Sequence, residues 1–359
     1  MGNGAGSAIM ALVLAAGIGG TAWWLYTRPR PSTGCGTKTC PAGQKLNTVC
    51  TCVPDIGGGG NGGTPTTTGL DKFGIKQLYA SVGHDWFSKW DNGHARSFQG
   101  GPEKCPSPAR IADPDDSGSW LQCNPGSALG QFVRIDGKGV AEMEGKNLRY
   151  YIMDGKKWLN VEMTGYYYNV KPFSGTTNVA LRLAVRTNHW NYLACASSGT
   201  EYAYEEKMNG TIQIRRESGH PYYNENVISS ISGVPKQKWV GMKIVCRNTP
   251  EGWVLIQCYR DMTDGLNGGD WKLVVQIIDK GNWPMAPADI AGWNKLQSGT
   301  GICKKIASPY AILKDPADAC LIRCDGQTMR FKKMSAREIA PLASSSSYTA
   351  MLYTPFVRA

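Results

Sequence analysis

The sequence predicts an all-β fold, an antiparallel β-sandwich, preceded by one N-terminal transmembrane helix. From about residue 70 to residue 341, many short runs of β-branched and aromatic residues are separated by Gly, Asn, Asp and Pro, and no useful helical period occurs there. The helix is predicted because residues 1–27 carry no charged side chain. Of the 359 residues, 42% are hydrophobic, which excludes disorder throughout the chain.

Residues 1–30 are predicted to anchor the chain in a lipid bilayer. The apolar run AIMALVLAAGIGGTAWWLY, residues 8–26, would span roughly 28 Å as a helix and ends in interfacial aromatics, Trp23, Trp24 and Tyr26. A cleaved signal peptide is the alternative, but it needs a positively charged start and a shorter apolar stretch. The start MGNGAGS resembles a myristoylation signal, although its hydroxyl, Ser7, comes one position late.

Two observations disagree about the orientation of this anchor. Arg28 and Arg30 directly follow the apolar run, which places the C-terminal part on the cytosolic side. Twelve cysteines, all beyond residue 34, favour disulfides and an oxidising compartment. A cytosolic orientation and disulfides are compatible in a large DNA virus that oxidises thiols in the cytosol. The alternative is ordinary export of the protein to a cell surface. The predicted location is therefore a single-pass protein of a virion membrane or a cell surface.

Three short segments flank the predicted sandwich at residues 70–341. Residues 31–52 form a cysteine-rich module with disulfide candidates Cys35, Cys40, Cys50 and Cys52, for which zinc binding is the alternative. Residues 53–69 form a Gly/Thr-rich linker with a mean reach of roughly 20–25 Å. Residues 342–359 form a C-terminal tail. The folded part is thus expected on a tether.

The clearest strands show an alternation of apolar and polar residues. In residues 178–186, Val179, Leu181, Leu183 and Val185 share one face, while Arg182 and Arg186 lie on the other. In residues 211–217, Ile212 and Ile214 point inward, and Gln213, Arg215 and Glu217 point outward. Residues 238–246, 253–259 and 271–279 form three more strands, joined into antiparallel hairpins by TPEG and DGLNGGD turns.

Several of these segments together resemble a known family. They are NVEMTGYYY, RTNHW, YEEKMNGTIQIRRESGHPYY, QKWVGMKIVCRN, WVLIQCYRD, GGDWKLVVQIIDKGNW and MSAREI. The succession resembles a family of concanavalin A-like (jelly-roll) β-sandwich domains from surface and polysaccharide-associated proteins of archaea, bacteria and large DNA viruses. The resemblance covers residues 73–341 and implies the fold but no activity, because this sandwich hosts lectins, hydrolases, lyases and structural domains. With the anchor and stalk, the chain resembles a virion membrane or minor capsid protein.

The charge of the chain favours an acidic partner. The formal net charge is +11, of which residues 1–70 contribute +3. An anionic polysaccharide or lipid surface is favoured over nucleic acid, and solubility alone is the competing explanation. The resemblance implies that one sheet face binds polysaccharide. The glycan-binding candidates are Arg182, Arg186, His189, Arg215, Glu217 and His220. Neighbouring shell proteins of a capsid are the other predicted partner.

A polysaccharide lyase acting on uronate-containing glycans is the alternative function. It needs an Arg or amide to neutralise the uronate and a Tyr or His to move protons. The strand motifs of well-known alginate lyases are absent, but these groups can be supplied by Arg186, His189, Arg215, His220, Tyr202, Tyr204, Tyr222 and Tyr223. A hydrolase is disfavoured because the adjacent Glu205 and Glu206 point to opposite faces. We therefore predict binding without assigning catalytic residues.

No cofactor is predicted, apart from an alternative in which structural calcium binds at an acidic turn. The two candidate turns contain Asp113, Asp115 and Asp116, and Asp261, Asp264, Asn267 and Asp270. The competing explanation is that Asp, Asn and Gly simply make turns. The sandwich also contains eight cysteines, with Cys105 and Cys123 as the disulfide candidates. The sequon Asn209-Gly210-Thr211 is expected in a hairpin turn.

Overall fold

The computed structural model describes two compact units of the chain. The described residues are 44–46, 52–54, 69–100, 110–122, 131–145, 148–172, 180–188, 199–219, 222–230, 235, 237–283, 290–291, 310–325 and 327–342. The smaller unit comprises residues 1–61 and 350–353. Its described part is an antiparallel pair, β1 (Gln44–Leu46) with β2 (Cys52–Pro54).

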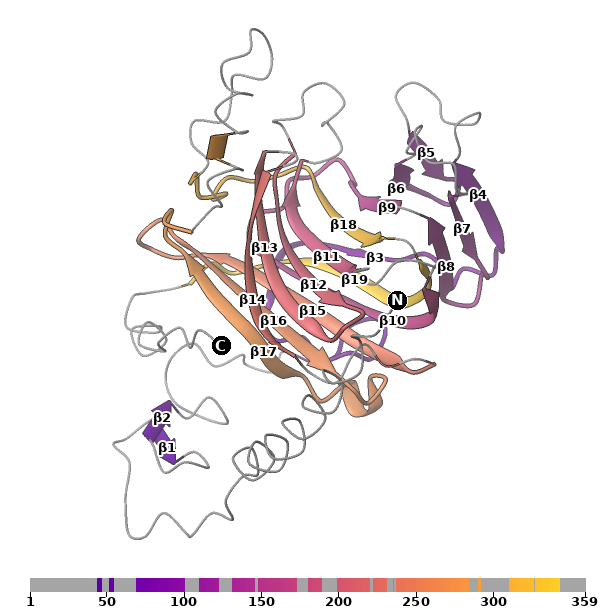
Figure 1. Ribbon diagram of the computed structural model, residues 1–359. Helices are drawn as coiled ribbons and strands as arrows, with labels where there is room; N and C mark the ends of the chain where they lie inside the picture. Colours follow the sequence, from indigo (N-terminus) through magenta and orange to yellow (C-terminus); the bar gives the residue numbers. More distant parts are fainter. Residues whose placement is uncertain are drawn as a thin grey trace, which may run out of the picture. The chain divides into compact units, whose positions relative to one another are not determined.

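The larger unit contains two antiparallel sheets (Figure 1). Its nine-stranded sheet has the order β17-β16-β15-β10-β19-β8-β7-β4, and β3 pairs with β19. The strands of this sheet are β3 (Ser81–Phe87), β4 (Arg96–Gly100), β7 (Gln131–Ile135), β8 (Val140–Gly145), β10 (Val161–Pro172), β15 (Trp239–Asn248), β16 (Val254–Asp261), β17 (Lys272–Asp279) and β19 (Gln327–Ile339). A short 3-10 helix, Leu266–Gly268, lies between β16 and β17.

The eight-stranded sheet has the order β14-β13-β12-β11-β18-β9-β6-β5. Its strands are β5 (Arg110–Asp113), β6 (Asp116–Gln122), β9 (Leu148–Ile152), β11 (Ala180–Thr187), β12 (Glu201–Lys207), β13 (Thr211–Gly219), β14 (Tyr222–Ser230) and β18 (Ala319–Cys324). Figure 1 shows β11, β12 and β13 side by side in this sheet. We call the face of each sheet toward the other sheet its core face, and the opposite face its outer face.

The core lies between the two sheets and is built from alternate residues of each strand. Leu181, Leu183 and Val185 of β11 belong to one buried apolar cluster with Met242 and Ile244 of β15 in the other sheet. Antiparallel strands with one apolar face stack in this way because the inner faces of both sheets leave water together. The predicted all-β sandwich is therefore confirmed in its architecture.

The predicted strands are present, and their ends differ from the prediction by at most two residues. The predicted strand over residues 178–186 is β11, and the one over residues 211–217 is β13. The two hairpins predicted from the TPEG and DGLNGGD turns are β15–β16 and β16–β17, both antiparallel. Alternation and turn composition were sufficient here because each hairpin depends on local pairing.

The predicted membrane anchor at residues 8–26 lies outside the described residues. Among the helices that the structure describes, none combines the length and the apolar character needed to cross a bilayer.

Candidate functional site

The outer face of the eight-stranded sheet carries a row of charged side chains that crosses neighbouring strands. Arg182 on β11 lies opposite Glu205 on β12 and, on its other side, opposite Arg323 on β18. Arg323 in turn lies opposite Arg149 on β9. We call Arg149, Arg323 and Arg182 the arginine row. Directly opposite side chains are close neighbours in an antiparallel sheet, so the row brings three guanidinium groups together.

Glutamates neutralise one end of the arginine row. Arg182 forms ion pairs with both Glu201 and Glu205, and the three side chains are at most 1% exposed. Burial alone would raise the pKa of Glu205, but the positive charges of Arg182 and Arg215 outweigh it and lower this pKa to about 2. Glu205 also accepts a hydrogen bond from the Gln213 amide. This end of the row is therefore a buried and well-paired charge cluster.

At the other end of the row, Arg323 on β18 and Arg149 on β9 lie opposite each other. Arg323 donates a hydrogen bond to Asp325, at 2.7 Å from Nε to Oδ1. Burial lowers the pKa of Arg323, and the adjacent charges of Arg182 and Arg149 lower it further. Its side chain remains 12% exposed. Because like charges on opposite residues repel, an additional anion beside Arg323 would be stabilised by the field of the row.

A second row on the same face, which we call the aromatic row, borders the arginine row. It runs across six strands through Trp120, Tyr151, Leu321, Ala184, Ala203 and Arg215. Trp120 stacks on Tyr151 with ring centroids 4.5 Å apart and planes 19° apart. The Tyr151 hydroxyl donates to Gln122 at 3.0 Å. Trp120 is only 7% exposed and Tyr151 is fully buried, so a packed apolar strip lies beside the cations.

The structure brings three of the six predicted glycan-binding residues together. Arg182, Arg215 and Glu217 all lie on the outer face of the eight-stranded sheet, and Arg215 approaches Glu205 at 3.5 Å. Gln213 joins them, as the alternation predicted. His189 and His220 lie outside the described residues.

The prediction that Arg186 shares this face is wrong. Its backbone has a φ of 51°, and the pairing of β11 with β18 shifts register between Ala184 and Thr187. The guanidinium therefore turns away and donates to Leu159 O at 2.5 Å and to Leu313 O at 2.8 Å. Strict alternation fails here because a bulge changes the direction of the side chain that follows it.

The sequence reasoning missed Arg149 and Arg323. Each lies on a short strand whose other residues are nearly all apolar, LRYYI for β9 and ACLIRC for β18. The signal was available, because Leu148, Tyr150 and Ile152 alternate with Arg149 and Tyr151. A lone arginine opposite the apolar face of such a strand predicts an outward position.

The cysteine count favoured disulfides, but four sandwich cysteines that were not among the named candidates form none. Cys246, Cys258, Cys320 and Cys324 are free and buried. All four point into the core between the sheets, where they pack as small apolar residues. Burial raises the pKa of the Cys246 thiol to about 11. The candidates Cys35, Cys40, Cys50, Cys105 and Cys123 lie outside the described residues, and of Cys52 only the backbone is described.

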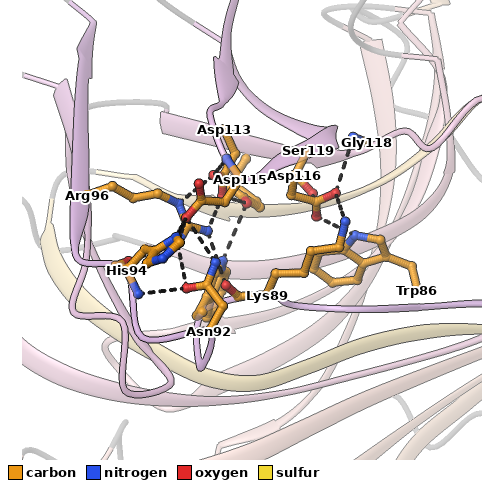
Figure 2. A network of polar contacts seen from close by, with 12 residues as sticks. Trp86, Lys89, Asn92, His94, Arg96, Asp113, Asp115, Asp116, Gly118 and Ser119 are labelled. Carbon is orange, nitrogen blue, oxygen red and sulfur yellow. Dashed lines mark hydrogen bonds and ion pairs between the residues drawn. The ribbon is translucent and has the colours of Figure 1, made fainter.

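Protein donors occupy the carboxylates of the first acidic turn (Figure 2). Asp113 accepts two hydrogen bonds from Arg96, at 2.5 and 2.8 Å, and a third from the Tyr150 hydroxyl. Asp116 accepts from the Trp86 indole at 2.8 Å and from Ser119 at 2.7 Å. These contacts tie β3 and β4 of one sheet to the β5–β6 hairpin of the other. The turn therefore joins the two sheets.

The second acidic turn is organised around a single carboxylate. Asp261 accepts from the backbone N–H groups of Thr263, Gly265 and Asp270, and from the Tyr166 hydroxyl at 2.9 Å. Over the described stretches of the chain, no three His, Cys, Asp or Glu side chains are grouped so as to hold a metal ion. The contacts at both turns are those of turn-forming aspartates.

The tryptophans in and beside the strands of the nine-stranded sheet are covered to different extents. Trp283 is only 3% exposed and packs in the core. Trp239, Trp253 and Trp271 are half-buried, each with a lysine ammonium 4.2 to 4.6 Å from its ring centroid. Trp190 and Trp293 lie outside the described residues.

Comparison with known proteins finds weak structural similarity alone. No family model and no curated protein sequence matches the chain. An endo-β-1,3-glucanase from Pyrococcus furiosus shares 9% identity over 77% of this chain and 100% of that chain, with a TM-score of 0.38. A carbohydrate-binding module from Bacillus subtilis shares 7% identity over 55% and 86%, with a TM-score of 0.33. An alginate lyase from a Chlorella virus shares 8% over 59% and 89%, with a TM-score of 0.32. At this level of similarity, the neighbours establish no activity for this chain.

Proposed function

We propose that the outer face of the eight-stranded sheet binds an acidic polysaccharide. The observation that carries this proposal is the arginine row, in which Arg149, Arg323 and Arg182 lie on three adjacent strands. A carboxylate or sulfate beside Arg323 would relieve the repulsion within the row, and a guanidinium matches such a group with two parallel N–H donors. The basic charge of the whole chain would raise the rate of encounter with a polyanion.

Two groups of residues have different roles in this proposal. Arg323 and Arg215 keep 12% of their side chains exposed and contact the glycan. Arg182, held by Glu201 and Glu205, is neutralised and holds the neighbouring strands β11 and β12 in position. The stacked rings of Trp120 and Tyr151 are buried beside the arginines and support this part of the sheet face by packing.

The test is binding of the full-length protein to immobilised polyuronates and sulfated glycans at increasing salt. We expect retention on at least one of them, weakening as salt rises, and a loss of about tenfold in affinity for Arg323→Gln. Lys272→Gln is the control for charge alone, because its side chain is 72% exposed on the other sheet. Equal weakening by both variants would reduce the proposal to nonspecific charge attraction, and absence of retention on every acidic glycan would refute it.

The same assay distinguishes binding from lyase activity. A lyase would release unsaturated uronates, which absorb ultraviolet light, whereas a binding protein would leave the glycan intact. We propose binding because the residues that the structure describes on this face supply cations and an amide for a uronate. Product formation that disappears in Arg323→Gln would instead assign catalysis to this face.

We further propose that the domain is tethered to a membrane through residues 8–26, on a virion or a cell surface. Support comes from the uncharged apolar run and the Gly/Thr-rich linker after it. Asn209 of the sequon is exposed at the turn between β12 and β13, so its use reports the orientation. A glycan lost in Asn209→Gln would place the domain in a secretory lumen. Release of the protein by alkaline carbonate would contradict the anchor.

A further inference from the structure

A groove on the outer face of the nine-stranded sheet combines an aromatic ring with a charged row. Its volume is about 350 Å³, and its lining includes Arg134, Glu142, Arg330 and Trp239. This is within the range of ligand pockets, about 300–1,000 Å³. The groove belongs to the sheet opposite the arginine row, so the acidic-glycan proposal does not use it.

The register of five strands builds this groove. Arg134 on β7 lies opposite Glu142 on β8, and Glu142 lies opposite Arg330 on β19. The row continues from Arg330 to Tyr168 on β10 and then to Trp239 at the start of β15. Alternate residues of adjacent strands share one face, so these side chains converge although the sequence separates them widely.

Ion pairs hold the polar part of the groove in place. The carboxylate of Glu142 lies 2.9 Å from Nε of Arg330 and 3.6 Å from Nη1 of Arg134. The arginine side chains are 48% and 63% exposed, so both retain N–H groups that face solvent. An acceptor and a donor thus stand side by side at the surface, which suits two neighbouring hydroxyl groups of one ligand.

Side chains that do not line the groove hold its aromatic ring, Trp239, in place. The ammonium of Lys332 lies 4.2 Å from the ring centroid of Trp239 and pairs with Asp264 at 2.8 Å. Lys332 does not line the groove, whereas the half-buried indole does. Tyr168 supports the same indole with ring centroids 5.4 Å apart. The indole is therefore fixed in position while part of its surface faces the groove.

The charges that line the groove determine which ligand fits. Two arginines face two carboxylates, because Asp136 also lines the groove. The balance gives a charged ligand no net attraction, whereas a sugar ring can lay its C–H face on the indole and its hydroxyls on the Glu142–Arg330 pair. The geometry points to a second carbohydrate site here, one that binds an uncharged sugar unit of a polysaccharide.

The test is electrophoresis of the full-length protein through native gels that contain neutral β-glucan, mannan, xylan or galactan. We expect at least one of them to retard the protein, and expect Trp239→Ala and Glu142→Gln each to weaken that binding about tenfold. Trp239→Phe should retain part of it. Trp253→Ala is the matched control, because Trp253, directly before β16 of this sheet, is also half-buried with the ammonium of Lys280 4.5 Å from its ring centroid.

The outcomes separate this site from the arginine row. Arg323→Gln should leave retardation by the neutral glycan unchanged, and Glu142→Gln should leave polyuronate binding unchanged. Glu142→Gln keeps the inference testable if Trp239→Ala does not fold, because its ion pairs are exposed and contribute little to stability. Absence of retardation by every neutral glycan, or equal weakening in Trp253→Ala and Trp239→Ala, would overturn the inference.

Discussion

Arg182 and Glu205 lie directly opposite each other on β11 and β12, and their side chains form an ion pair that is almost completely buried. Glu201 binds the same guanidinium from the same face. The pair joins two strands of the eight-stranded sheet beside the residues that we propose contact an acidic glycan. Burial removes water that would otherwise screen the two charges, so neither side chain tolerates loss of the other.

Replacing Arg182 should strongly destabilise the protein. In Arg182→Ala, Glu201 and Glu205 remain buried without their cation, and we expect a loss of about 3–5 kcal/mol in the free energy of unfolding. Urea denaturation followed by circular dichroism measures this loss. In the double variant Arg182→Met with Glu205→Leu, only Glu201 is left buried without Arg182, so it should be more stable than Arg182→Ala. If the double variant is less stable than Arg182→Ala, the destabilisation has another cause.

Acid should weaken the fold through Glu205. Its pKa is about 2 in the folded protein, below the ordinary value of 4.5 for Glu, so its stabilising effect is complete above pH 4.5 and is lost as the pH falls toward 2. A shift of this size corresponds to roughly 3 kcal/mol. Urea denaturation midpoints between pH 6 and pH 2.5 test this. The denaturation midpoint should fall less steeply with decreasing pH in Glu205→Gln than in the unaltered protein. An equally steep fall would assign the acid sensitivity to other carboxylates.

Asp261 should be essential for the turn between β16 and β17. Asp261→Ala removes the acceptor of three backbone N–H groups and of the Tyr166 hydroxyl, and we expect a loss of roughly 3 kcal/mol or more. Thermal melting with and without EDTA tests whether calcium stabilises this turn. Because the turn is satisfied by protein donors, chelation should leave the melting temperature of the unaltered protein unchanged. A fall in the melting temperature would instead favour bound calcium.

The four buried thiols should be unreactive in the folded protein. Burial raises the pKa values of Cys246, Cys258, Cys320 and Cys324, so little thiolate is present and reagent has no access. Peptide mapping after iodoacetamide treatment should find these four cysteines unlabelled in buffer and labelled in denaturant. Labelling of Cys246 or Cys320 in the native protein would show that the sheets separate.

Local sequence patterns were sufficient to predict single strands and hairpins. The alternation of Leu181 and Leu183 with Arg182 placed the first two in the core and the third on the outer face. Patterns were insufficient where the backbone departs from regular pairing, as at Arg186, whose positive φ turns its side chain away from the predicted face. A pattern of period two carries no information about such a bulge.

The sequence by itself determined the all-β class, the positions of the clearest strands, and the outward direction of Arg182, Gln213, Arg215 and Glu217. Only the tertiary structure decided that Arg149 and Arg323 complete a row with Arg182, and that Trp239 meets the Glu142–Arg330 pair. The physical reason is that alternation along one strand depends on neighbours in the chain. The order of strands in a sheet depends instead on how two whole sheets bury their apolar faces together.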